Sequence, residues 1–443
     1  MKVSHTLDRL RVAFDDPRLV ADAGLLLPAT LAQRLGLKGL LDEHVDLGGV
    51  PGSANPGEKA LTVVAGLLAG GDCIDDVNIL RSRWTQGVLG HRVAAPSTVG
   101  TFLRAFTWGH ARQLDLVSRE LLRRAWAAGA GPGEAPVTLD VDSAICETYG
   151  LLKQGGSDFT HTHVRGYHPL LGTVAGTGDV VHGRLRSGPA NTARGASSFV
   201  TETFRRVRDA GATGLLTVRA DSGFYNHKVV GACRKADVRY SITVRLNAKL
   251  HRAIADIADD AWTPIPYFLD GADVAETTYT PFAGRRGAGP VRLIVRRVRP
   301  TPGSQLAFEG LLFTYHAFIT DRDGDTLWLE ADHQRHAEVE NTIRDLKYGV
   351  GLNHLPSGRF AANAAWLALN IVAHNLARWV SRLGLGETLV TTKTLRHRHL
   401  AVPGRLAFSG RCVDLHLPAH WPWADPFLGA LQRLRTLPMA TPA

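Results

Sequence analysis

The chain has 443 residues, of which 44% are hydrophobic and 21% are charged, a composition typical of globular proteins. Its 51 basic residues outnumber the 41 acidic ones, so that the formal net charge is +10 and polyanions are favoured as partners. The apolar runs are too short to cross a bilayer, no secretory signal begins the chain, and the four cysteines form no metal-binding or disulfide pattern. We therefore expect a cytoplasmic protein without a membrane partner.

Helical periodicity dominates the first part of the chain. Apolar residues recur at spacings of three and four, which predicts an all-helical N-terminal domain over residues 1–130. A Gly/Pro-rich segment at 127–136 then ends the helical pattern. Between residues 137 and 246 the period becomes that of strands, with a helix at 196–211, and the strands are predicted at 137–142, 168–176, 179–186 and 215–221. This part is predicted to begin a mixed α/β core.

The second half of the chain changes character twice. Short strand-like pieces between Gly/Pro turns predict a β-rich insertion over residues 247–325. Helical periodicity then returns over residues 326–385, which we assign to the second part of the core, and a basic C-terminal region covers 386–443. The predicted fold class is therefore α/β, with a mixed-sheet core, a helical N-terminal domain, a β insertion and a helical C-terminal region.

Acidic residues end two of the predicted strands. In the segment VTLDVDS the strand period of two places Asp140 and Asp142 on one face of the sheet, and Asp221 ends the apolar strand LLTVRAD. A single acid at a strand end often only caps a turn. Two strands of one predicted sheet that both end in acids are harder to explain in this way.

A third acid lies on the later helix HQRHAEVENTIRDLKYGVG. Val339, Ile343, Leu346 and Val350 form its core-facing stripe, and Glu338 and Glu340 lie on opposite flanks of that stripe. The Glu340 flank also carries cationic side chains, namely His333, His336, Arg344 and Lys347. Glu338 is interpreted as solvent-facing. For Glu340 an alternative is an ion pair with Arg344, four residues on.

Three separated carboxylates suit phosphoryl transfer that uses two metal ions. Mg²⁺ prefers oxygen ligands and keeps several waters, so a few acids are enough to hold it. Two ions about 4 Å apart activate a nucleophile on one side of a phosphodiester and stabilise the leaving oxygen on the other.

The segments LDVDS, RADSGFY and AEVENTIRDLKYGVGLNHLP resemble the DDE transposases of bacterial insertion sequences, specifically the IS1380 group within the IS4-like superfamily. The resemblance covers nearly the whole chain and implies an RNase H-like core. It implies that Asp142, Asp221 and Glu340 are the catalytic triad and hold two Mg²⁺ ions, or Mn²⁺ in their place, with Asp140 the weaker candidate in its strand. The 119 residues between Asp221 and Glu340 leave room for the insertion.

One family signature is only half kept. In the IS4-like pattern Tyr-x₂-Arg-x₃-Glu-x₆-Lys, the Tyr and Arg positions are His333 and His336 here, whereas Lys347 matches. The resemblance therefore implies that Lys347 neutralises a phosphate, and we expect His333, His336 and Arg344 to be DNA contacts.

Two blocks without acids add candidate DNA contacts. One lies in the insertion and contains Arg292, Arg296 and Arg299, and the other covers 393–412 and contains Arg396 and Arg398. Solvated strand edges also carry such residues, which is the alternative for each block. Trp262 is a further candidate, for stacking on an unpaired base, although a partly buried tryptophan is more common.

The resemblance implies a cut-and-paste DNA transposase. Its partners would be double-stranded DNA, as the terminal inverted repeats and the target, and a second copy of the chain in the DNA complex. It would be associated with the nucleoid. Two alternatives stay open: an endonuclease or recombinase that does not transfer strands, and a non-enzymatic DNA-binding derivative of a transposase.

Overall fold

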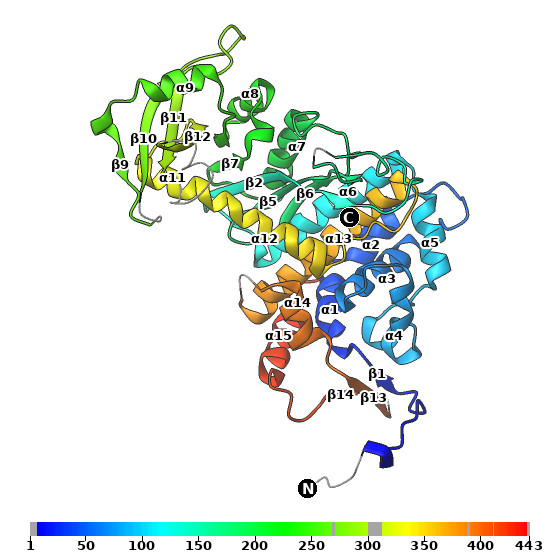
Figure 1. Cartoon of the computed structure of the whole chain (residues 1–443). Coiled ribbons are helices and arrows are strands. Elements are labelled where there is room, and N and C mark those ends of the chain that lie inside the picture. The colour runs from blue at the N-terminus through cyan, green and yellow to red at the C-terminus, as the bar shows by residue number, and fades with distance from the viewer. Residues whose placement is uncertain are drawn as a thin grey trace.

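A nine-stranded mixed sheet runs through the molecule, with helices on both of its faces (Figure 1). The computed structural model describes residues 7–160, 162–267, 271–299, 312–387, 390–410 and 412–440. The strand order is β6-β5-β2-β7-β8-β12-β11-β10-β9. The strands are β2 (Val137–Ser143), β5 (Leu170–Val174), β6 (Val180–Arg184), β7 (Leu216–Ala220), β8 (Arg239–Thr243), β9 (Thr263–Pro264), β10 (Ala272–Tyr279), β11 (Val291–Val298) and β12 (Thr314–Thr320).

The first five strands in this order form the predicted RNase H-like core. β2, β7 and β8 are parallel, and β5 and β6 continue the sheet in antiparallel fashion. Parallel neighbours require crossover connections, which α7 (Ala196–Asp209) and α8 (His227–Lys235) supply. Every residue of β7 is buried, as expected for a strand covered on both faces. The predicted α/β class is confirmed.

The two faces of the core are covered by different helices. A Cβ at Gly172 in β5 would touch Phe199 and Thr203 of α7, whereas a Cβ at Gly183 in β6 would lie 2.3 Å from Ile371. Ile371 belongs to α13 (Phe360–Trp379), a helix that is buried along nearly its whole length. Glycine at 183 therefore lets α13 approach the sheet closely.

The insertion continues the core sheet. β12 pairs antiparallel with β8. This insertion strand therefore covers the backbone N–H and C=O groups that would otherwise be unpaired at the edge of the core. Beneath α11 (Thr326–Gln334) this part has a small core of its own, made of Ile265, Ala272, Val274, Ile294, Phe318 and Leu329. One further helix, α9 (Ala248–Ala255), lies between β8 and β9.

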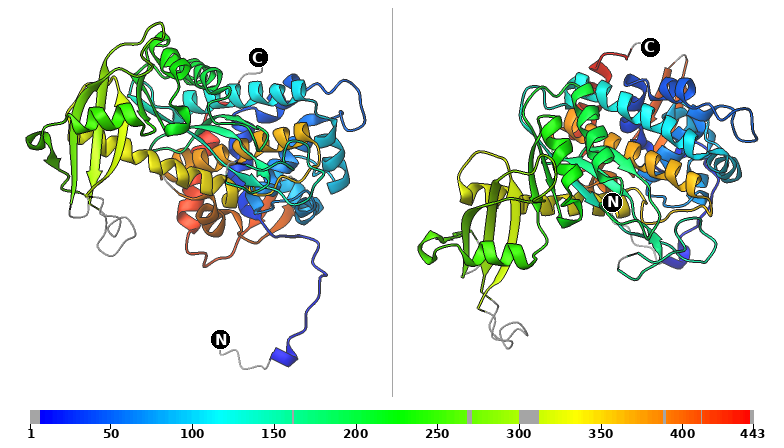
Figure 2. Two further views of the ribbon diagram at one scale, coloured as in Figure 1. Left: turned by 45° about the horizontal axis from the view of Figure 1, so that its top comes forward. Right: turned by 90° about the horizontal axis from the view of Figure 1, so that it is seen from above.

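The N-terminal helices share one hydrophobic core with the sheet. Buried residues connect without a break from Leu25, through α13, to Leu434 near the C-terminus. Figure 2 shows these helices packed together beside the sheet. They are α1 (Leu26–Arg34), α2 (Leu37–His44), α3 (Pro56–Ala69), α4 (Arg83–Leu89), α5 (Pro96–Ala105) and α6 (Trp108–Ala125).

The C-terminal region returns to the start of the chain. A short strand, β1 (Leu19–Val20), pairs with β13, so a three-stranded sheet links both ends of the chain. This sheet was not predicted, because β1 has only two residues and the region that holds β13 and β14 was expected to be helical. The elements here are α14 (Thr392–Leu395), β13 (Gly404–Ser409), β14 (Cys412–His416) and α15 (Ala424–Thr436). β3 (Cys146–Glu147) and β4 (Gly166–Tyr167) form a separate pair.

A long interrupted helix joins the insertion to the core (Figure 1, yellow). α11 runs into a 3₁₀ turn at Arg335–Ala337, then into α12 (Glu338–Arg344), and ends in a π turn at Asp345–Gly349. Such departures from regular α-helix occur often at functional sites. None of the helices in the described ranges is long and apolar enough to cross a membrane.

Candidate active site

Asp142 and Asp221 lie side by side at the ends of two adjacent parallel strands. The register pairs Asp140 with Arg219 and Val141 with Ala220, so the next positions in the same register are Asp142 and Asp221. Neighbouring strands are about 4.8 Å apart. The Asp221 carboxylate also accepts a hydrogen bond of 3.0 Å from the backbone of Gly223, which turns the chain away from the strand.

Glu340 is the third carboxylate near the ends of these strands. α12 packs against β2, and the charges of Asp221 and Glu340 both act on Asp142. Burial raises the pKa of Asp142 to about 6, helped by these two carboxylates and opposed by His336 and by the backbone N–H of Ser143. The structure thus places near one another the three acids that the sequence singled out, from three separate elements, although their ligand atoms do not all lie within 4.8 Å of one another.

Asp140 has a different environment from Asp142. Its side chain is 1% exposed and accepts two hydrogen bonds of 2.8 Å from the guanidinium of Arg219, on the adjacent strand β7. Such a two-pronged ion pair occupies both carboxylate oxygens. Asp140 therefore serves as the partner of a buried arginine, and the sequence contained no signal for Arg219 beyond its place in the same strand as Asp221.

His336 connects this ion pair to the active site. Its Nδ1 lies 2.9 Å from Oδ1 of Asp140, which as a carboxylate accepts the proton of that nitrogen. The other ring nitrogen, Nε2, is buried and has no hydrogen-bond partner in the described part of the chain. Because His336 also acts on the charge of Asp142, its ring lies near both the ion pair and the Asp142 carboxylate.

The helix that carries Glu340 is anchored at its N-terminal side. Arg219 reaches Asp332 of α11 as well, and Asp332 in turn pairs with Arg322. His333 is buried, hydrogen-bonds through both ring nitrogens to Ser241 and Thr243, and stacks on Phe318. Burial holds the pKa of His333 well below its usual value. With both nitrogens occupied inside the core, His333 is not placed to contact a phosphate, contrary to our expectation.

The same helix is anchored at its other end by Asp345. This buried carboxylate accepts hydrogen bonds from the backbone and hydroxyl of Thr392, at 2.8 and 2.9 Å, and lies 3.2 Å from Arg378 of α13. Burial alone would raise its pKa, but His374, Arg378 and Thr392 lower it to about 2. Sequence reasoning missed this network, because its members come from three helices.

The other charged residues of the Glu340 helix have different surroundings. Glu338 is half-buried as a residue, with 43% of its side chain exposed, and pairs with Arg335 at 2.9 Å. Arg344 is exposed and hydrogen-bonds to Asn341, and in the described residues it makes no ion pair with Glu340. Lys347 is half-buried and lies close enough to Cys146, just after β2, to act on its thiol. Lys347 is therefore near the end of the strand that carries Asp142.

The insertion arginines are mostly engaged within the protein. Arg292 makes two hydrogen bonds of 2.6 Å to Glu276 and a third to a backbone carbonyl. Arg296 pairs with buried Glu330 at 3.2 Å, whereas Arg299 is exposed. Trp262 is partly buried beneath Arg297, whose guanidinium lies 4.2 Å from the ring centroid. Only Arg299 of the predicted three is presented to solvent.

The two C-terminal arginines also differ in how far they are engaged by other parts of the protein. Arg396 is half-buried and donates hydrogen bonds to the backbone carbonyls of Leu67, Leu68 and Gly349, so it joins the N-terminal helices to the end of the Glu340 helix. Arg398 lies over the ring of Trp423 at 5.9 Å. Arg396 is a structural tie, while Arg398 is only loosely held.

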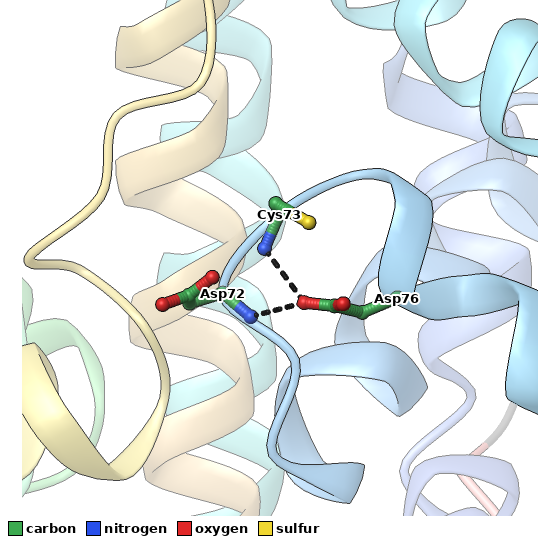
Figure 3. Close-up of side chains that lie close together, drawn as sticks. All are labelled: Asp72, Cys73 and Asp76. Carbon is green, nitrogen blue, oxygen red and sulfur yellow. Dashed lines mark hydrogen bonds between the residues drawn. The ribbon is translucent and has the colours of Figure 1, made fainter.

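A second acidic group lies in the loop after α3 (Figure 3). One ligand atom each of Asp72, Cys73 and Asp76 lies within 4.8 Å of the others. However, the Asp76 carboxylate accepts hydrogen bonds from the backbone of both Asp72 and Cys73, at 2.9 and 3.1 Å. We read this group as a loop held in place by Asp76 and assign no metal to it.

The donor set of the triad fits divalent cations. In the described residues, none of the three carboxylates is paired with a lysine or arginine, and the repulsion felt by Asp142 is what a bound cation would relieve. All three offer hard oxygen ligands, which Mg²⁺ and Mn²⁺ prefer.

A mixed α/β core that brings two strand-end aspartates under a helical glutamate is the arrangement of DDE-type nucleases and transposases. The family model of the transposase DDE domain, group 1, matches residues 4–439, and the chain belongs to this family. No curated protein matches it. Among solved structures it is similar to piggyBac transposase in a synaptic complex with hairpin DNA, at 13% identity and a TM-score of 0.47, over 86% of this chain and 80% of that one.

Proposed function

We propose that this protein is a DNA transposase of the IS1380 group, which cleaves the ends of an insertion sequence and joins the freed 3′-OH to target DNA. The observation that carries the proposal is the convergence of Asp142, Asp221 and Glu340 from β2, β7 and α12. Membership of the DDE transposase family supports the reaction class.

In this proposal Asp142, Asp221 and Glu340 hold two Mg²⁺ ions. When bound, such ions activate a nucleophile and stabilise the leaving oxygen of a phosphodiester. The protein contributes position: the Asp140–Arg219–Asp332 network and Asp345 fix the two ends of the helix, so that Glu340 stays over the strand ends. Lys347, near the end of β2, and Arg344, on the exposed side of the helix, are proposed contacts for DNA phosphates.

His336 takes the place of an arginine in the family signature. Because its Nδ1 is held by Asp140, the ring has a fixed orientation beside the acids. We propose that it orients the bound DNA end, with Arg299 and Arg398 as further backbone contacts.

The partners follow from the reaction. Terminal inverted repeats and target DNA are the proposed substrates, the helices within residues 1–130 recognise the ends, and two copies of the chain hold paired ends together. We propose the same regions as functional units: the two parts of the core at 137–246 and 326–385, the insertion at 247–325, and the basic C-terminal region at 386–443. The protein would act at the nucleoid.

The deciding experiment offers the protein a duplex that carries the inverted repeats flanking its gene, together with a target plasmid and Mg²⁺. A transposase releases the end and produces joined DNA. Cleavage without joined product would establish an endonuclease instead, and specific binding without cleavage would establish a DNA-binding derivative.

A further inference from the structure

A cleft lined by arginines lies between α6 and α7, away from the three acids. Its outer part has a volume of about 340 Å³, and Arg112, Arg119, Arg205 and Arg206 line it. A smaller inner part shares Arg112 and Arg206 and reaches Arg184 of β6. We call these two parts together the arginine cleft. Nothing in the three-carboxylate site explains this concentration of positive charge.

The charges in the cleft do not cancel. Five arginines line it against two acids, Asp115 and Glu202. Arg206 lies 3.5 Å from Asp115, Arg184 lies 2.6 Å from Glu202, and Arg119 is paired with Asp209 outside the lining. Arg112 and Arg205 are both exposed and, within the described residues, have neither an ion pair nor a hydrogen bond. Two guanidiniums that face one opening are therefore free.

The positive field is felt by the groups at the base of the cleft. Burial lowers the pKa of His182 well below its usual value, and the nearby charges of Arg206, Arg184 and Arg112 lower it further. Burial likewise raises the pKa of Asp115, against the opposing effect of the arginines. An anion entering the cleft would meet arginines whose charge is only partly compensated.

The cleft lies at the same end of the sheet as the active site. Arg184 pairs with Leu170, and Leu170 pairs with Ser143, the residue after Asp142. Two strand spacings, about 10 Å, therefore separate Arg184 from the end of β2 in the plane of the sheet. The two groups lie on different faces, because Arg184 packs over Phe199 of α7 whereas Asp142 points to the face opposite α7. DNA bound at the three acids would therefore reach the cleft by passing around the β6 edge of the sheet.

We propose that the arginine cleft binds the phosphate backbone of DNA, with Arg112 and Arg205 as the contacting residues. The inference rests on the proposed function and adds a contact that the sequence did not indicate. Guanidinium groups bind phosphate oxygens through paired hydrogen bonds, and each phosphate neutralised contributes to the salt dependence of binding.

The test compares the full-length protein with the double variant Arg112→Ala/Arg205→Ala. Affinity for an end duplex is measured by fluorescence anisotropy between 50 and 200 mM salt, without divalent metal. The slope of log K against log salt should fall by about two units, since each lost phosphate contact removes about 0.9. Arg252→Ala/Arg435→Ala removes the same charge from two other exposed arginines and should leave the slope unchanged.

A second variant, expected to change the salt slope in the opposite direction, controls for a general loss of fold. Glu202→Gln releases Arg184 from its ion pair and should steepen the slope by about one unit. Equal slopes for the wild type and both cleft variants would overturn the proposal. Inorganic phosphate, titrated by calorimetry, separates the sources: phosphate binding lost in the double variant while the DNA slope stays unchanged would assign the cleft to free phosphate and also overturn it.

Failure of this inference is distinguishable from failure of the proposed function. A wild type that binds and cleaves its ends, together with cleft variants that keep the wild-type salt slope, would overturn this inference alone. A wild type that neither binds nor cleaves its ends would contradict the proposed function itself.

Discussion

Asp140 and Asp142 stand two residues apart on one face of β2, yet only Asp140 is bound in an ion pair with a buried arginine. Its partner Arg219 occupies both of its oxygens, whereas Asp142 faces Asp221 and Glu340. The structure thus gives two identical side chains different roles, because the adjacent strand presents an arginine to one and an aspartate to the other.

Replacing each acid of the triad should abolish the reaction. Asp142→Ala, Asp221→Ala and Glu340→Ala should each lower the rate of end cleavage by at least about 10³-fold, which corresponds to about 4 kcal/mol of lost transition-state stabilisation. Gel assays with Mg²⁺ measure the rate. Glu338→Ala is the matched control, because Glu338 lies on the same helix but pairs with Arg335 at the surface. Near-normal cleavage by any triad variant would remove that residue from the site.

Asp140 should contribute to the free energy of unfolding. Asp140→Ala leaves Arg219 buried without its carboxylate, and breaking a buried ion pair costs about 3 kcal/mol or more. Urea denaturation should therefore show a large loss for Asp140→Ala and little change for Asp142→Ala, whose carboxylate has no cationic partner of this kind. A fully stable Asp140→Ala that is inactive would instead give Asp140 a direct part in the chemistry.

Divalent metal should stabilise the folded protein through the same three acids. At ten times its dissociation constant Mg²⁺ adds about 1.4 kcal/mol, which raises the melting temperature by a few degrees at most. Glu340→Gln should remove most of this shift, while Glu338→Gln should keep it. Scanning fluorimetry with Mg²⁺ and with EDTA makes the comparison, and an undiminished shift in Glu340→Gln would place the metal elsewhere.

Asp345 should contribute to stability in a defined range of pH. Its folded-state pKa of about 2 lies below the ordinary value of 3.8, so its contribution is complete above about pH 5 and is lost as the pH falls toward 2. Between pH 5 and pH 3 this loss amounts to about 1 kcal/mol. Asp345→Asn should be less stable than the wild type at pH 5, with the difference shrinking at pH 3. If urea denaturation gives the same difference in unfolding free energy between Asp345→Asn and the wild type at both pH values, this prediction is contradicted.

The insertion arginines should contribute little to DNA binding. Sequence alternation alone would suggest that replacing Arg292, Arg296 and Arg299 lowers the salt slope by about two units. Since Arg292 is held by Glu276 and Arg296 by Glu330, we now expect a drop of at most about one unit, from Arg299. The triple alanine variant and Arg299→Ala alone should therefore have the same slope, and a larger drop in the triple variant would return Arg292 and Arg296 to the interface.

The sequence by itself determined the elements and the candidate acids. Strand period, helical stripes and the change of pattern near residue 137 are local properties, so they predicted the mixed core, and the motifs around Asp142, Asp221 and Glu340 indicated the triad. The tertiary structure alone decided which charged side chains are free. Asp140, His333, Arg292, Arg296 and Arg396 are engaged by partners elsewhere in the chain, and Arg112 and Arg205 are left open in the cleft between α6 and α7. Whether a charge is neutralised depends on neighbours in space, and periodicity along the chain carries no information about them.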